Sequence, residues 1–76
     1  MTSEEIAALY ARSLQEAKAI TDGMPSDWRP KYEWKKCLES NKNTLEHTLS
    51  KDCWTSEDLT PLQDAVKAAE TALASL

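Results

Sequence analysis

The sequence has few residues that interrupt helices: one glycine and three prolines in 76 residues. β-Branched residues are also scarce, apart from threonines that mostly stand where helix caps or turns are expected, whereas alanine and leucine are abundant. Alanine and leucine favour helices, and strands are enriched in β-branched and aromatic residues. The composition therefore predicts an all-α fold. A chain this short forms one hydrophobic core at most, so we expect a single domain over residues 1–76.

Long apolar runs are absent as well. None approaches the roughly 18 residues that a membrane-spanning helix needs. The first ten residues, MTSEEIAALY, lack the basic start and the apolar stretch of a secretory signal. We therefore expect a cytoplasmic protein with no membrane partner.

Residues that commonly carry catalysis or bind metals are few. His47 is the only histidine, and its spacing from Cys37 and Cys53 is not that of a zinc site. On a helical projection His47 lies off the inward stripe and has no neighbour to orient it as a base. A single glycine leaves no glycine-rich phosphate loop. These absences predict a protein that is not an enzyme and binds no metal or cofactor.

The two cysteines are not expected to form a disulfide with each other if the second helix runs to about residue 50. Cys37 would then lie roughly 20 Å back along the helix axis. The three residues from the helix end to Cys53 can return only about 10 Å. Two small buried thiols are the expectation, although a break in the second helix would relax this geometry.

Apolar residues at three- and four-residue spacing predict three helices packed as a compact bundle with short connectors. The first spans about 3–21, with Thr2 and Glu5 in a capping-box arrangement and a stop at Gly23 and Pro25. The second spans about 27–50, with Ser26 as a cap and Pro30 in its first turn. Weak helix formers at 40–44 allow a break there, which would give four helices.

The third helix is expected over about 57–75. Its cap is either Thr55 with Asp58, or Thr60 with Pro61 at the first helical position. The residues expected to face inward across the three helices are Ile6, Leu9, Tyr10, Leu14, Ala17, Ile20, Trp34, Cys37, Leu38, Asn41, Leu45, Thr48, Leu49, Leu59, Leu62, Val66, Ala69, Leu73 and Leu76. Trp54, in the connector, is expected to close one end of the bundle.

The third helix also carries a second flank of small residues, Ala65, Ala68 and Ala72. Small side chains allow another helix to approach closely, so this flank could be a homodimer or partner seam. It could equally be a solvent face of high helix propensity. The sequence leaves both readings open.

Charge is unevenly distributed. The net charge of −4 divides into −2 over residues 1–25, +2 over 26–51 and −4 over 52–76. Proteins that hold phosphates are normally basic overall. Direct nucleic-acid binding through residues 28–36 is therefore disfavoured, since acidic residues are also interspersed on the same helix.

Two aromatic residues at the start of the second helix are not needed by the core. On the helical projection Tyr32 falls about 160° from the inward Trp34, and Trp28 lies nearer to Tyr32. Large aromatics beside basic residues resemble the composition of a protein-binding face. The residues expected to form it are Trp28, Arg29, Tyr32, Lys35 and Lys36. Trp28 could instead fold back over the corner between the first two helices.

One family resemblance adds an alternative. Residues 44–59, TLEHTLSKDCWTSEDL, together with KKC a few residues earlier, resemble the central part of the Hha/YmoA family. Those are small helical bacterial proteins that modulate nucleoid proteins by binding them. The resemblance covers under half of the chain with gaps, and the first helix here has no counterpart. It implies a regulator that binds a protein partner, and it assigns no residue a role.

These observations predict a small acidic regulator or inhibitor that docks on another protein, such as an adaptor, an antitoxin-like factor or a phage-type inhibitor of a host protein. Three alternatives remain open: a Hha/YmoA-like modulator of a nucleoid protein, direct nucleic-acid binding through residues 28–36, and a nucleic-acid mimic. The mimic would use an acidic surface at Asp52, Glu57, Asp58 and Asp64.

Overall fold

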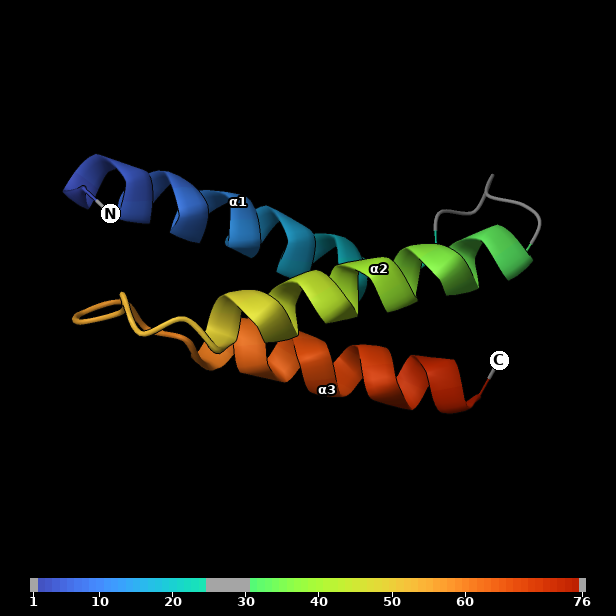
Figure 1. The fold of residues 1–76 in the computed structure, drawn as a ribbon. Coiled ribbons are helices and arrows are strands. Elements are labelled where there is room, and N and C mark those ends of the chain that lie inside the picture. The colour runs from blue at the N-terminus through green and yellow to red at the C-terminus, as the bar shows by residue number, and fades with distance from the viewer. Residues whose placement is uncertain (1, 25–30, 76) are drawn as a thin grey trace.

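Three α-helices make up most of residues 2–24 and 31–75, the part of the chain that the computed structural model describes. In chain order they are α1 (Ser3–Asp22), α2 (Lys31–Leu49) and α3 (Thr60–Ala74). Each helix packs against the other two, and the bundle measures 40 × 21 × 15 Å. In Figure 1, α2 runs in the opposite direction to α1 and α3, and the 50–59 connector lies at the end where α1 begins. The predicted all-α bundle is confirmed, and no strand occurs in the two described ranges.

Both ends of α1 form as the sequence predicts. The Thr2 side chain accepts a hydrogen bond from the Glu5 amide at 3.1 Å, and the Thr2 amide donates to Glu5 Oε1 at 3.2 Å. These bonds use two amide donors that a helix start leaves without partners. At the other end Gly23 takes a φ of 81° and its amide donates to the Ile20 carbonyl. Only glycine adopts that backbone region without steric cost.

α2 is continuous through the weak helix formers at 40–44, so the four-helix alternative is wrong. Leu38 and Leu45 stand on either side of this run and are 1% and 0% exposed. Burial of these two leucines offsets the low intrinsic propensity between them. Cys37 and Cys53 are free and half-buried, in keeping with the geometry of an unbroken helix. The predicted start near residue 27 and its cap lie outside the described residues.

α3 begins at Thr60 rather than at residue 57, and both predicted caps are wrong. Leu59 occupies the cap position without a side-chain bond. The amide of Thr60 donates instead to Asp58 Oδ1 at 3.0 Å. Glu57 accepts from the amides of Thr55 and Ser56 at 3.1 and 3.2 Å. Carboxylates that bond nearby amides in this way stabilise a turn in competition with the helix, which places the helix start later.

The core lies along the contact of all three helices. Its buried apolar residues are Ala17, Ile20, Trp34, Leu38, Leu45, Leu62, Ala65, Val66 and Ala69. All but Ala65 belong to the predicted inward stripes. Two polar residues are also buried, Thr48 as predicted and Ser13 unexpectedly. Ser13 Oγ donates to the Leu9 carbonyl at 2.8 Å, which satisfies its hydroxyl inside its own helix.

The alanine flank of α3 is part of this core rather than a solvent face. Ala65 is 0% exposed, and Ala68 and Ala72 are half-buried against the core cluster. α3 packs against both α1 and α2, so its apolar surface must be wider than a single stripe. The small side chains allow this double contact within one chain.

Trp54 closes one end of the bundle, as predicted. Its Nε1 donates to the Thr48 carbonyl at 3.0 Å, and its ring meets the Tyr10 ring edge-on with centroids 6.1 Å apart. The Tyr10 hydroxyl donates to the Asp58 carbonyl at 2.7 Å. The connector is therefore tied to α1 and to the end of α2.

None of the described helices combines the length and hydropathy that crossing a bilayer requires.

Candidate functional site

The predicted protein-binding face, hereafter the aromatic face, consists of Trp28, Arg29, Tyr32, Lys35 and Lys36 and lies only in part within the described residues. Trp28 and Arg29 lie in the range that is not described, and Tyr32 is placed only by its backbone in the first turn of α2. Lys35 and Lys36 are exposed on α2. This face stays a prediction.

Acidic residues are interspersed with these lysines. Glu33 and Glu39 are exposed on the same helix, and Lys42 pairs with Glu46 one turn along. The described part of α2 therefore carries both charge signs on its surface. A phosphate backbone would meet carboxylates as well as ammonium groups there, which does not favour direct nucleic-acid binding.

The predicted acidic surface divides into separate places. Asp58 and Asp64 line one groove, at the start of α3. Asp52 lines a different hollow, together with Ser50, Cys53 and other residues. The carboxylate of Glu57 is already engaged by two backbone amides of the connector. A nucleic-acid mimic built from all four would lack the continuous acidic row that a phosphate backbone presents.

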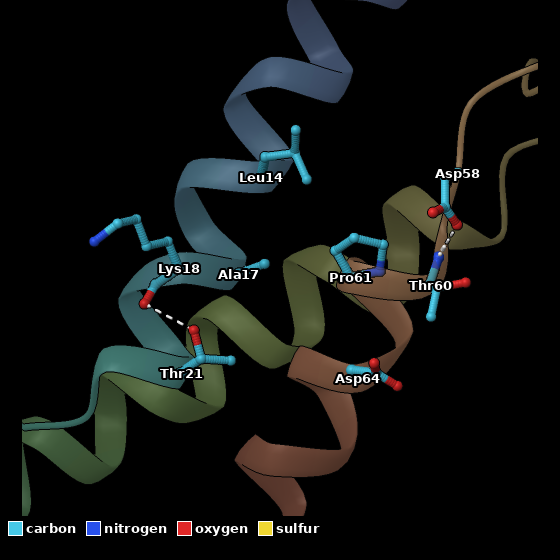
Figure 2. Close-up of a pocket in the computed structure, with 8 residues that line it drawn as sticks. All are labelled: Leu14, Ala17, Lys18, Thr21, Asp58, Thr60, Pro61 and Asp64. Carbon is cyan, nitrogen blue, oxygen red and sulfur yellow. Dashed lines mark hydrogen bonds between the residues drawn. The ribbon is translucent and has the colours of Figure 1, made fainter.

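The groove that contains Asp58 and Asp64 is formed by two helices that are far apart in the sequence. It lies between the second half of α1 and the start of α3 (Figure 2) and has a volume of about 470 Å³. That volume is within the roughly 300–1,000 Å³ of typical ligand pockets. The residues that line it are Leu14, Ala17, Lys18, Thr21, Asp58, Thr60, Pro61 and Asp64.

The groove has an apolar floor because small or compact side chains stand where α1 and α3 face each other. Ala17 contributes only a methyl group, and Figure 2 shows it pointing toward the ring of Pro61. Leu14 lies one turn earlier on α1 and is half-buried. Pro61 is tolerated in the first turn of α3 because amides there have no partner within the helix. The result is an aliphatic surface that is open to solvent.

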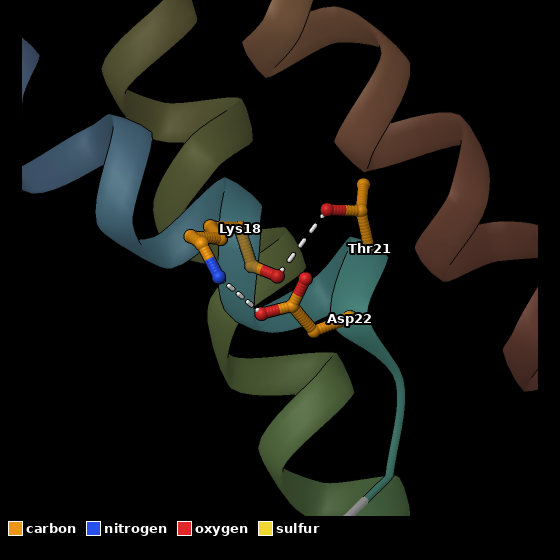
Figure 3. A network of polar contacts seen from close by, with 3 residues as sticks. All are labelled: Lys18, Thr21 and Asp22. Atoms are coloured by element: carbon orange, nitrogen blue, oxygen red, sulfur yellow. Dashed lines mark hydrogen bonds and ion pairs between the residues drawn. The ribbon is translucent and has the colours of Figure 1, made fainter.

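The basic group on the α1 side of the groove is paired within its own helix. Lys18 Nζ lies 2.6 Å from Asp22 Oδ2, and both side chains are largely exposed. The Thr21 hydroxyl donates to the Lys18 carbonyl at 3.2 Å, so the three residues form one local network (Figure 3). Figure 2 shows the Lys18 ammonium directed away from Pro61. This side of the groove therefore carries little net charge.

The α3 side of the groove is negative. Hydrogen bonds from the Thr60 backbone and side chain lower the pKa of Asp58 below its ordinary value, so this carboxylate is ionised at neutral pH. Asp64 is exposed one turn into α3. No lysine, arginine or histidine of the described ranges forms an ion pair with either residue. The groove therefore has an apolar floor and a negative rim along its α3 side.

The lining supplies binding contacts rather than a set of reactive groups. Its described residues supply hydroxyls, carboxylates, one paired lysine and aliphatic carbon, and none of them is a histidine or a cysteine. Over residues 2–24 and 31–75, no three His, Cys, Asp or Glu side chains come together as metal ligands would. His47 is exposed on α2, away from this lining.

The sequence indicated Asp58 and Asp64 as part of an acidic surface, but it did not indicate the groove that they line. Its lining comes from residues 14–21 and 58–64, two segments whose mutual placement only the packed bundle defines. Leu14, Ala17 and Thr21 repeat at helical spacing, but this pattern is equally typical of the border of a core stripe.

No protein-family model, curated protein or solved structure matches this chain. The resemblance of residues 44–59 to the Hha/YmoA family therefore gains no support from these comparisons. In the structure the same residues form the last six positions of α2 and the whole 50–59 connector.

Proposed function

We propose that this protein acts by binding another protein, as an adaptor or inhibitor, and that the groove between α1 and α3 is a contact surface. The observation that supports the proposal is the form of this groove. Its floor of Leu14, Ala17 and Pro61 is apolar, and its edges carry hydroxyl and charged groups. Protein interfaces have the same anatomy, an apolar centre surrounded by a polar rim.

The composition of the lining favours recognition over chemistry. Catalysis requires a nucleophile or base that a third group orients, and the lining offers two threonine hydroxyls, with Asp58 as only a weak base beside Thr60 because hydrogen bonds from Thr60 lower its pKa. One of these, on Thr21, is already bonded to a backbone carbonyl. Binding an apolar side chain of a partner requires only that floor and rim.

The aromatic face at Trp28 and Tyr32 belongs to the same proposal as a second contact surface. Lys35 and Lys36 would form its rim, and both are exposed. Tyr32, Lys35 and Lys36 belong to α2, whereas the groove is lined by α1 and the start of α3, so the two surfaces can be separated by mutation.

The test uses Thr21→Trp, which fills the groove from an exposed position without altering the core. Thr71→Trp is the matched control, because Thr71 is also exposed on a helix and does not line the groove. Tagged wild-type protein and both variants are incubated with cell lysate, and captured proteins are identified by mass spectrometry. We expect a partner that wild type and Thr71→Trp retain and that Thr21→Trp loses, with unchanged helical circular dichroism.

Other outcomes would show which part of the proposal is wrong. If both tryptophan variants keep the partner and Trp28→Ala/Tyr32→Ala loses it, the contact surface is the aromatic face and not the groove. If wild type captures nothing above the tag alone, the proposal of a protein-binding function is wrong.

A further inference from the structure

We infer that the α1–α3 groove binds a cationic amphipathic peptide segment, in which an aliphatic side chain is flanked by lysine or arginine. The inference rests on the proposed function and narrows it to one class of partner. Charge complementarity between the groove rim and such a segment carries the argument.

The charge at the rim is negative and available for pairing. Asp58 and Asp64 line the groove, and neither forms an ion pair with a described residue. The positive charge of Lys18 is balanced by Asp22 at 2.6 Å. A partner with basic residues beside its anchor would pair with the two aspartates, whereas an acidic partner would be repelled.

The apolar floor of the groove favours an aliphatic side chain as the part of the peptide that enters it. Leu14, Ala17 and Pro61 present aliphatic carbon, and none of the described residues that line the groove is aromatic. The volume of about 470 Å³ is at the smaller end of typical pockets, which suits one or two aliphatic side chains such as leucine.

Asp58 is held in place before any partner arrives. Its carbonyl accepts the Tyr10 hydroxyl at 2.7 Å, and its Oδ1 accepts the Thr60 amide at 3.0 Å. The second carboxylate oxygen remains able to accept a bond from a partner's ammonium or guanidinium group. A rim charge that is already positioned loses less conformational entropy on binding than a free side chain does.

The experiment measures fluorescence anisotropy with two labelled 14-residue peptides. Both carry leucine at positions 4, 8 and 11, and either arginine or glutamate at positions 1, 5 and 12. The rim variant is Asp58→Asn/Asp64→Asn, in which asparagine keeps an oxygen that can accept the Thr60 amide. The control variant is Glu39→Gln/Glu70→Gln, which changes net charge equally at two exposed positions outside the groove.

We expect the arginine peptide to bind wild type and the glutamate peptide to bind much more weakly. The rim variant should lose roughly fivefold in affinity for the arginine peptide, since it removes two exposed ion pairs, each of which contributes modestly to binding. The control variant should change less than about twofold, because its charges lie outside contact with the peptide. Thr21→Trp should abolish binding.

Equal loss in the rim and control variants would show that only overall charge matters, and would overturn the inference. So would equal binding of the two peptides, no binding of either, or full binding by Thr21→Trp. Light scattering covers one further case: a wild-type dimer that Thr21→Trp converts to a monomer would make a second copy the occupant. If Thr21→Trp abolishes lysate capture while the rim variant does not, the proposed function stands and this inference fails.

Discussion

At the scale of single residues, Tyr10 joins α1 to two points of the 50–59 connector. Its hydroxyl donates to the Asp58 carbonyl and its ring packs edge-on against Trp54. Tyr10→Phe removes the hydrogen bond and keeps the ring contact. We expect it to lower the free energy of unfolding by about 1 kcal/mol, the usual net value of such a bond. Urea unfolding followed by circular dichroism measures this, and an unchanged midpoint would show that the bond does not hold the connector.

The carboxylates of the connector make stability depend on pH. Amide donors, chiefly that of Thr55, lower the pKa of Glu57, and Thr60 lowers that of Asp58. As the folded pKa values lie below the unfolded ones, the unfolded chain binds protons first when pH falls. The stabilisation is complete above the unfolded pKa values of about 4 and is lost as pH drops through the lower folded values.

We therefore expect the urea midpoint to be nearly constant from pH 7 to 5 and to fall below about pH 4. Glu57→Gln should weaken this dependence, because glutamine accepts hydrogen bonds without titrating. Glu70→Gln, at an exposed position of α3, should leave the dependence close to that of wild type. A Glu57→Gln profile that coincides with wild type would show that this carboxylate does not contribute.

At the scale of elements, α3 depends on small side chains where it meets both other helices. Ala65 is 0% exposed in the core. Ala65→Leu adds volume that the packed interior cannot accept without shifts, which typically costs about 1–3 kcal/mol. Ala74→Leu is the control, since Ala74 is exposed at the end of the same helix. The thermal unfolding midpoint should fall strongly for Ala65→Leu and little for Ala74→Leu. Equal midpoints of the two variants would show that Ala65 is not packed in the core.

Element boundaries were predictable where local signals decide them. Thr2 with Glu5, and Gly23, define both ends of α1 within a few residues of sequence. The start of α3 was mispredicted because Asp58 accepts the Thr60 amide from outside the helix. Several nearby residues can accept a hydrogen bond from an amide at a helix start, so the sequence did not show which of them would do so. The continuity of α2 was left open, because burial of Leu38 and Leu45 by the other helices decides it.

At the scale of the whole molecule, the fold class followed from composition and periodicity, but the groove did not. Its lining joins Leu14 to Thr21 on α1 with Asp58 to Asp64 at the start of α3. How deeply such a surface is hollowed depends on how two helices approach, and side-chain spacing along either helix does not contain that information. Sequence reasoning could recognise the acidic residues and not the apolar floor beside them.

The stability of the whole bundle should be sensitive to single core positions. A 76-residue domain has only about 4–11 kcal/mol of stability at about 0.05–0.15 kcal/mol per residue. Leu45 is 0% exposed, and Leu45→Ala should cost about 2–5 kcal/mol through lost burial and the cavity it leaves. Because 1 kcal/mol corresponds to about 4–8 °C at this size, the Tm should fall by roughly 10 °C or more.

Leu14→Ala distinguishes an effect on binding from an effect on folding, when its Tm and its affinity for the arginine peptide are both measured. Leu14 is half-buried and lines the groove, so its truncation leaves no enclosed cavity and should lower the Tm less than Leu45→Ala does. It removes part of the apolar floor, and should therefore weaken binding of the arginine peptide while the protein stays folded. A Leu14→Ala protein with wild-type peptide affinity would show that the floor makes no contact with the anchor. A Tm loss as large as that of Leu45→Ala would place Leu14 in the core instead.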